Sequence, residues 1–334
     1  MKEVKQIMDE VRNGKIMPVY FLCGDEPYFI DQLTDFLEEN LLPEADRSFN
    51  QMVLYGRDVT MNEVISNAKR FPMMADRQVI LIREAQDITR DFDLLATYLD
   101  YLQPTTVLVF AYKYKSFDKR KAVYKKLNAQ GVFFESKRLY ENQIGSFITE
   151  NLHQSGYAID PKATAMLVSF LGTDLSKIVN ELNKLRIVTP KSTKITDVVI
   201  EQNIGISKDY NYFEFQKAIA IKDQVKAFKI AQYFGQNQKE NPLVVTVSMA
   251  FKFFTNLMIA HATPTPTNNV LQKVLRVNYF AAEDLVNGLR NYPMRKVSSI
   301  IESIRTIDMK SKGVESNSIS ANDLLKELLV QIFN

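Results

Sequence analysis

Short apolar segments alternate with amphipathic ones along the first 140 residues. The apolar segments are near-continuous runs of Val, Ile, Leu and aromatic residues, and they lie at 17–23, 51–56, 78–83, 105–112 and 131–136. Runs of this length without polar alternation are typical of strands buried on both faces of a parallel sheet. Segments with helical spacing lie between them, at 28–41, 60–70, 91–102 and 118–130. The pattern predicts a doubly wound α/β domain over residues 1–140, with a short helix before its first strand.

After about residue 140 nearly all of the spacing is helical. Residues 141–207 contain four helical segments, and their ends carry typical signals: Gly156 after the first, Asp160 and Pro161 before the second, Gly172 after it. The third segment begins at Asp174 and the fourth near Thr196. These residues predict caps, since Asp and Thr favour helix starts and Gly favours helix ends. We interpret 141–207 as a small helical domain.

The remainder, residues 208–334, predicts a helical bundle. Its helical segments are expected at 211–222, 223–235, 242–262, 267–276, 279–290, 293–312 and 320–333. The breaks fall at "HATPTPTNN", "NYP" and "KGVESNSIS", which are rich in turn-forming residues. The fold class is therefore α/β followed by all-α.

Composition fits a globular protein and excludes some classes. The 334 residues are 46% hydrophobic and 24% charged, and the net charge is only +3, which is not that of a strongly cationic nucleic-acid binder. The single cysteine, Cys23, lies in an apolar run and is expected to be buried; no internal disulfide can form, which fits the cytoplasm. The N-terminus lacks a signal-peptide pattern, and no uncharged apolar stretch of 18 residues predicts a membrane helix.

A nucleotide site is the first chemistry to test for in such an α/β domain. The turn after the first strand should carry G-x-x-x-x-G-K-[ST], whose backbone N–H groups and lysine hold phosphates. Here it reads "GDEP", with Gly24, Asp25 and Glu26 and no lysine. Two carboxylates at this corner would repel a triphosphate. We interpret the corner as a degenerate nucleotide site that does not bind.

The third strand also lacks what ATP hydrolysis requires. It should end in acidic residues that position Mg²⁺, but it ends in Arg83 followed by Glu84. The two histidines, His153 and His261, with one cysteine form no zinc pattern, and no G-x-S-x-G motif is present. The Asp and Glu residues are scattered along helix faces. The sequence therefore predicts no catalytic residues, no metal and no cofactor.

Five motifs in register resemble one family. "MPVYFLCGDEPYFIDQLTDFL" and "FPMMADRQVILIREAQD" lie in the α/β part, "DLSKIVNELNKL" in the middle, and "VNYFAAEDLVNGLRNYP" and "IIESIRTIDMKSKG" near the end. In the last, Ile307, Asp308, Lys310, Lys312 and Gly313 approximate a family pattern. Together they resemble the delta-subunit family of the bacterial DNA polymerase III clamp loader.

The resemblance implies fold, partners and activity. The fold would be AAA+-like: an α/β domain, a three-helix lid and a helical collar. Members bind the β sliding clamp, open its ring for loading on primed DNA, and assemble through their collars with delta-prime and tau/gamma subunits, which hydrolyse ATP. Such a chain has no catalysis of its own, although the holoenzyme is a DNA-directed DNA polymerase, a nucleotidyltransferase.

The resemblance also implies the clamp-binding residues. Family members insert two adjacent apolar residues at a helix tip into the clamp, and the matching positions here are Met73 and Met74. Phe71 and Pro72 precede the pair, and Arg70 and Arg77 flank it. Flexible Met side chains suit an irregular pocket, and Pro72 would end the preceding helix. The alternative is that Phe71, Met73 and Met74 belong to the core.

A basic run follows the fourth strand. Contact with DNA phosphates is one interpretation of Lys113, Lys115, Lys119, Arg120 and Lys121, and a solvated helix face is the favoured alternative. Two other functions also stay open. An ATP-hydrolysing motor subunit of the tau/gamma kind would bind ATP saturably, and a non-replicative helical adaptor would not co-purify with the clamp.

Overall fold

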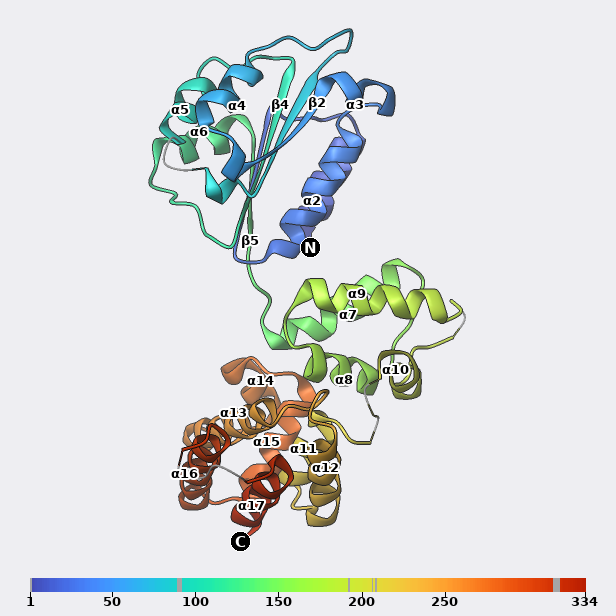
Figure 1. Cartoon of the computed structure of the whole chain (residues 1–334), viewed down its shortest axis with the longest axis vertical. Helices are drawn as coiled ribbons and strands as arrows, with labels where there is room; N and C mark the ends of the chain where they lie inside the picture. Colours follow the sequence, from blue (N-terminus) through green and yellow to red (C-terminus); the bar gives the residue numbers. More distant parts are fainter. Residues whose placement is uncertain (1, 89–91, 192, 206, 208, 315–318) are drawn as a thin grey trace. The chain divides into compact units, whose positions relative to one another are not determined.

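The computed structural model divides the chain into two compact units, Met1–Arg138 and Leu139–Asn334 (Figure 1). It describes residues 2–88, 92–191, 193–205, 207, 209–314 and 319–334. Three predicted features extend outside this described part. They lose residue 91, the first of the predicted helix 91–102; residue 208, the first of the predicted third domain; and residues 315–318 of the last predicted break.

The first unit is built on a five-stranded parallel sheet, as the apolar runs predict. Its strands are β1 (Val19–Gly24), β2 (Gln51–Tyr55), β3 (Gln78–Arg83), β4 (Thr106–Lys113) and β5 (Val132–Ser136). They lie in the order β2-β3-β4-β1-β5, and all four pairings are parallel. Nearly every residue of β1 and β4 is buried, because helices cover both faces of the sheet.

Six helices accompany the sheet: α1 (Lys2–Arg12), α2 (Pro27–Asn40), α3 (Glu44–Asn50), α4 (Met61–Ala68), α5 (Phe92–Leu99) and α6 (Ala122–Gln130). Figure 1 shows α2 on one side of the sheet and α4, α5 and α6 on the other. Phe21 of β1 anchors the second side, where it contacts the rings of Phe92, Phe110 and Phe117. Helix α3 is absent from the sequence prediction.

The parallel sheet has two distinct edges at the strand ends. Gly24, Arg83 and Lys113 end their strands at the carboxyl edge, where α/β proteins of this kind bind nucleotides. Asn50, Gln78 and Thr106 lie where strands begin, at the amino edge. The degenerate nucleotide corner and the segment with Met73 and Met74 therefore lie at opposite edges of the sheet.

In its described residues the second unit consists of helices and connecting loops, with one isolated bridge between Ile159 and Ile195. Its first part contains α7 (Glu141–Gln154), α8 (Pro161–Leu171), α9 (Leu175–Val188) and α10 (Asp197–Ile204). The predicted caps are confirmed: the side chains of Asp174 and Thr196 accept bonds from the backbone of α9 and α10, and Gly172 ends α8 with φ of 68°. The described residues between 141 and 205 thus form four helices, at the four segments where the spacing predicts them.

Seven further helices complete the second unit: α11 (Tyr212–Ala220), α12 (Gln224–Gln236), α13 (Leu243–Ala262), α14 (Asn268–Leu275), α15 (Tyr279–Asn291), α16 (Met294–Ser311) and α17 (Ala321–Phe333). Their buried side chains form one core around α13, α16 and α17. Among the described residues, α13 alone has the length and apolar composition of a membrane span, and 44% of that stretch is buried within the protein.

Candidate functional site

An exposed apolar tip lies at the amino edge of the sheet, in the loop 69–77 between α4 and β3. Phe71 is 77% exposed, Met73 is 64% exposed and Met74 is fully exposed. The alternative that places these three side chains in the core is therefore wrong. We call Phe71, Met73 and Met74 the apolar tip. Monomeric proteins seldom expose apolar side chains side by side unless they form a contact surface.

A buried amide holds the backbone of this loop. Asn50, the last residue of α3, is only 6% exposed. Its Oδ1 accepts a hydrogen bond from the Met73 N–H at 2.6 Å, and its Nδ2 donates to the Met73 carbonyl at 3.0 Å. Nδ2 also donates to the Asp46 carbonyl at 3.2 Å, within α3 itself. The amide thus pairs with both polar groups of Met73, as a neighbouring strand would.

A second amide holds the start of the loop. The Nε2 of Gln78 lies 2.6 Å from the Arg70 carbonyl, 3.2 Å from the Asn67 carbonyl and 2.8 Å from Thr106 Oγ1. Thr106 Oγ1 in turn donates to the Ala68 carbonyl, at the last residue of α4. The segment from Ala68 to Arg70 is therefore tied to the strands that begin beside it.

The tip itself has a strained backbone. Met74 has φ of 54°, in the left-handed region of the backbone that residues other than Gly and Asn seldom occupy. Pro72 lies four residues beyond the end of α4, and of the two flanking cations Arg70 is exposed and Arg77 half-buried. Local strain combined with exposed apolar side chains is a common sign of a functional loop.

The carboxyl edge, in contrast, is filled. Gly24 has φ of 132°, and a Cβ atom there would lie 1.9 Å from the Ser136 carbonyl oxygen. The next strand's backbone thus occupies the space above the turn. Glu26 is buried, and its Oε1 accepts a bond from the Tyr28 N–H at 3.1 Å. A carboxylate of the chain itself therefore occupies the N-terminus of α2, where a bound phosphate would lie, while Asp25 is exposed.

Two cations at the ends of β3 and β4 complete this edge. Arg83 Nη2 lies 2.7 Å from Asp35 and 2.6 Å from Glu38 of α2. Lys113 Nζ lies 2.6 Å from Asp31 and 2.8 Å from Glu84. These ion pairs place carboxylates beside the ends of β3 and β4, and they link α2 to the sheet.

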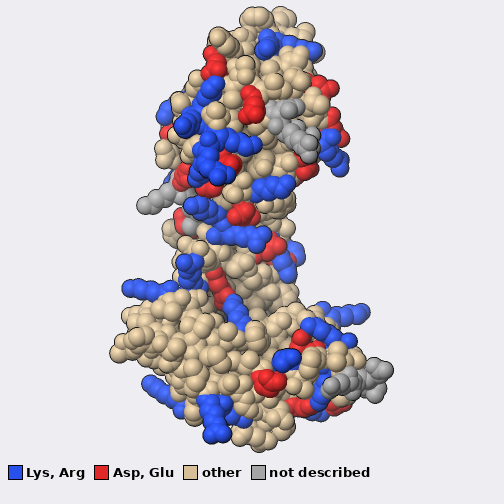
Figure 2. Space-filling view, turned by 90° about the vertical axis from the view of Figure 1, so that its left-hand side faces the viewer, with Lys and Arg blue, Asp and Glu red and all other residues tan. Residues whose placement is uncertain are grey.

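The basic run is largely paired. Lys113 is buried between its two carboxylates, so it is not available to DNA in this conformation. Lys119 pairs with Glu135 at 2.8 Å and Arg120 with Asp118 at 3.0 Å, while Lys121 lies over the Phe117 ring. Figure 2 shows basic side chains gathered on the first unit with acidic ones among them. DNA contact by Lys115, Lys119, Arg120 and Lys121 stays a prediction.

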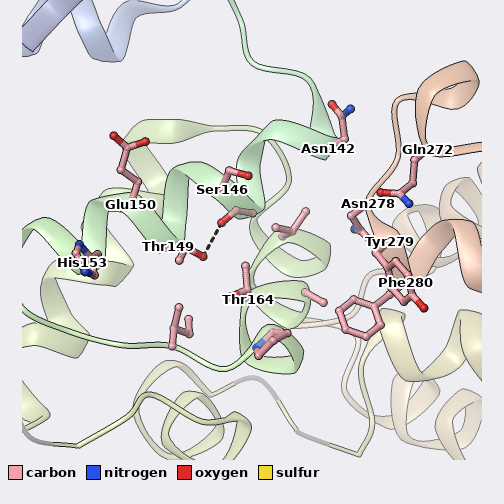
Figure 3. Close-up of a pocket in the computed structure, with 15 residues that line it drawn as sticks. Asn142, Ser146, Thr149, Glu150, His153, Thr164, Gln272, Asn278, Tyr279 and Phe280 are labelled. Carbon is pink, nitrogen blue, oxygen red and sulfur yellow. Dashed lines mark hydrogen bonds between the residues drawn. The ribbon is translucent and has the colours of Figure 1, made fainter. Parts of the chain in front are cut away.

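The second unit holds an open hollow of 590 Å³ between α7, α8 and the start of α15 (Figure 3). Asn142, Ser146 and Thr149 face it from α7, and Tyr279 and Phe280 face it from the other side. Its lining residues include Glu150 and His153, and none of them is Lys or Arg. The hollow therefore lacks the cations that a phosphate ligand requires.

The remaining candidate groups are the two histidines and the cysteine. His153 is exposed at this hollow, and a ring nitrogen of His261 lies 2.8 Å from the Tyr292 carbonyl oxygen. Cys23 is buried, as expected, and burial raises the pKa of its thiol to about 12, which keeps it unreactive. Within the described residues no group of three His, Cys, Asp or Glu side chains is placed to hold a metal ion.

Sequence reasoning identified the tip but missed the residues that hold it. Asn50 lies 23 residues before Met73 and outside the family motifs, whereas Gln78 lies inside the motif "FPMMADRQVILIREAQD" but shows nothing there of the bonds it makes. The only available signal was the position of each at the start of a strand. In a parallel sheet, such positions lie beside the loops that enter neighbouring strands.

Comparison with known proteins shows which proteins this chain is similar to. A model of the family described as DNA polymerase III, delta subunit, matches residues 20–137. The DNA polymerase III subunit delta of Bacillus subtilis (strain 168) is 22% identical over 340 aligned positions, which cover 99% of this chain and 95% of that one. The probable DNA polymerase III subunit delta of Aquifex aeolicus (strain VF5) is 21% identical, covering 88% of this chain and 86% of that one.

A solved structure shares the fold. The Bacillus subtilis DNA clamp loader delta protein superposes with a TM-score of 0.60 at 19% identity, covering 99% of each chain. These similarities confirm the resemblance that the five motifs indicate, and with it the fold class.

Proposed function

We propose that this chain, which resembles DNA polymerase III delta subunits along its length and matches their family model over residues 20–137, binds a β sliding clamp and opens the ring for loading on primed DNA. The observation that carries the proposal is the apolar tip, exposed on a loop that the buried amide of Asn50 and the half-buried amide of Gln78 hold. The chain would act in the cytoplasm, without catalysis of its own.

The tip has the composition of an interface anchor. Its two Met side chains can adapt to an irregular pocket, and Arg70 and Arg77 beside it suit the polar rim of a contact. Anchors of this kind contribute about 2–4 kcal/mol each when truncated to Ala. Neighbouring elements add apolar surface, since Phe49 of α3 and Val53 and Tyr55 of the edge strand β2 are also exposed.

Ring opening would follow from selective binding. A clamp protomer held by the tip in a conformation that strains the closed ring shifts the ring towards its open state. Such a shift requires a difference in affinity of a few kcal/mol between the open and closed rings. Because ion pairs and backbone fill the carboxyl edge, ATP on neighbouring subunits would supply the control and would expose or hide the tip.

Assembly would use the second unit, with 141–207 as lid and 208–334 as collar. Along α13 the side chains of Val244, Val245, Phe251 and Ile259 are exposed, and Figure 2 shows a broad area of this unit without charged side chains. Exposed apolar side chains on α13 suit contact with the delta-prime and tau/gamma subunits.

The test is the affinity of the isolated chain for its cognate clamp. We expect Met73→Ala with Met74→Ala to weaken binding at least about 30-fold, because both anchors are lost. A control that truncates two exposed apolar residues of the second unit, Met294→Ala with Val330→Ala, should leave it unchanged. Equal affinity of the tip variant and the native chain, measured by titration, would show that the clamp is bound elsewhere or not at all.

A further inference from the structure

The apolar tip is exposed, so packing of its own side chains does not fix its shape. We propose that Asn50 is the positioning residue for clamp binding: its side-chain amide holds the Met73 backbone so that both Met side chains are presented before the clamp arrives. This inference rests on the proposed function and concerns a residue that does not itself touch the clamp.

The two bonds to Met73 require both the oxygen and the nitrogen of the Asn50 side-chain amide. Oδ1 must accept from the Met73 N–H, and Nδ2 must donate to the Met73 carbonyl, at 2.6 and 3.0 Å. The third bond, to the Asp46 carbonyl, fixes which way the amide faces. Among the standard side chains of this length only Asn supplies a donor and an acceptor together; an Asp carboxylate has no proton to donate at neutral pH.

Removal of the Asn50 amide would allow the backbone of the tip to leave its unfavourable conformation. Met74 is held at φ of 54°, a conformation that is unfavourable for a residue with a Cβ. Gln78 ties the loop at Arg70, on the other side of Pro72, so its bonds do not reach Met73. Without Asn50 the loop would stay attached at its start while Met73 and Met74 sampled other conformations.

Preorganisation makes a defined contribution to affinity. When only a fraction of molecules has the binding-competent shape, the apparent Kd rises by the inverse of that fraction. Because Asn50 is buried beneath the loop, its loss should slow association and leave the contacts of the bound state largely intact. A fall of the competent fraction to between about 1% and 10% would weaken binding about 10- to 100-fold.

The experiment compares Asn50→Ala and Asn50→Asp with the native chain in binding to immobilised cognate clamp. We expect both variants to bind about 10- to 100-fold more weakly, chiefly through slower association per active molecule. The matched control is Asn40→Ala, since Asn40 Nδ2 makes the same kind of bond, to the Phe36 carbonyl at 2.8 Å, with no recorded bond to the loop. This control should bind like the native chain.

A second readout needs no variant. Amide hydrogen exchange should show the Met73 N–H protected in the native chain and unprotected in Asn50→Ala or Asn50→Asp, with the protection of β3 unchanged. An unprotected Met73 N–H in the native chain would overturn the proposal even if neither variant folded.

The outcomes separate the two proposals. Native affinity in folded Asn50→Ala, together with loss of binding in the Met73→Ala, Met74→Ala variant, would end the role of Asn50 and leave the clamp function standing. Native affinity in the tip variant would end both. Faster dissociation with unchanged association in the Asn50 variants would also contradict preorganisation.

Discussion

Lys113 lies at the end of β4, and its ammonium forms ion pairs with two carboxylates, Asp31 from α2 and Glu84 after β3. Burial opposes its charge, yet the hydrogen bonds to both carboxylates raise the pKa of Lys113 above its usual value. The pKa of Glu84 is lowered: burial works against the charge here too, but bonds from Lys113 and Gln86 outweigh it. The Lys113 ammonium thus partly neutralises the charges of Asp31 and Glu84 at the carboxyl edge of the sheet.

Substitution of this lysine should destabilise the first unit. Lys113→Met keeps the length of the side chain but leaves Asp31 and Glu84 unneutralised, and we expect a loss of about 1–3 kcal/mol in the free energy of unfolding, less than for a fully buried pair because both partners are partly exposed. Urea unfolding at pH 7 measures it. Exposed Lys115→Met serves as the control and should change stability by less than about 0.5 kcal/mol.

The pH dependence supplies a second check on the same pair. Because the pKa of Glu84 is lowered in the folded state, its contribution to stability is present above the pKa of the unfolded chain and is lost as the pH falls through the folded value. The loss caused by Lys113→Met should therefore shrink in acid. An equal loss at pH 7 and pH 3 would indicate a packing defect.

For single residues, the sequence shows which residue types stand at a site more readily than which side chains they contact. The absence of the phosphate-binding lysine and the presence of Arg83 at the end of a strand are visible in the sequence, and they predict a degenerate site. Lys113 reads as one member of a basic run, because nothing local reveals that Asp31 and Glu84 converge on it. Asn50 was overlooked for the same reason: its partner is 23 residues away in the sequence.

Among the elements, those with strong periodicity or caps were predicted to within a few residues. The five strands and the helices from α7 to α17 lie where the pattern of apolar and cap residues places them. Helix α3 was missed because its seven residues, EADRSFN, expose most side chains and so show no apolar face. That omission hid Asn50, since the end of α3 is what brings its amide to the loop.

The contact between α11 and α15 holds a buried carboxyl. Asp284 Oδ2 accepts a bond from Gln216 Nε2 at 2.9 Å. Burial raises the pKa of Asp284 to about 7, and the bond from Gln216 only partly offsets this. Between about pH 4 and pH 7 the folded chain therefore keeps a proton that the unfolded chain has lost, so this group's stabilisation is full in acid and is lost as the pH rises towards 7.

Replacement by the neutral amide should remove that dependence. Asp284→Asn can still accept the Gln216 bond and never ionises, so we expect it to exceed the native chain in stability at pH 8, by about 1–4 kcal/mol, and to approach it at pH 4. Thermal or urea unfolding across this range measures the difference. An exposed carboxylate of the first unit provides the control, since Glu39→Gln should keep the native pH profile.

For the molecule as a whole, the division into two units falls in a short exposed segment. β5 ends at Ser136, α7 begins at Glu141, and Lys137 and Arg138 between them are exposed. The sequence places this change at about residue 140, where apolar strand runs cease. Boundaries between units fall where few contacts cross, so the shift from strand to helix spacing was sufficient to locate it.

Limited proteolysis should find the same segment. We expect trypsin at low ratio to cut first after Lys137 or Arg138 and to yield fragments 1–138 and 139–334 that resist further digestion, because other basic residues lie largely on structured elements. Mass spectrometry identifies the fragments. The variant Lys137→Gln with Arg138→Gln should lose this first cut, whereas equally fast cleavage at many sites would contradict two independently compact units.

The sealed carboxyl edge has a consequence for timing. Parallel strands connect it to the amino edge that carries the apolar tip, and the strand ends here are occupied by the ion pairs of Arg83 and Lys113 and by the Ser136 carbonyl beside Gly24. If the proposed function holds, the timing of clamp binding would therefore depend on neighbouring subunits and not on a ligand at this corner.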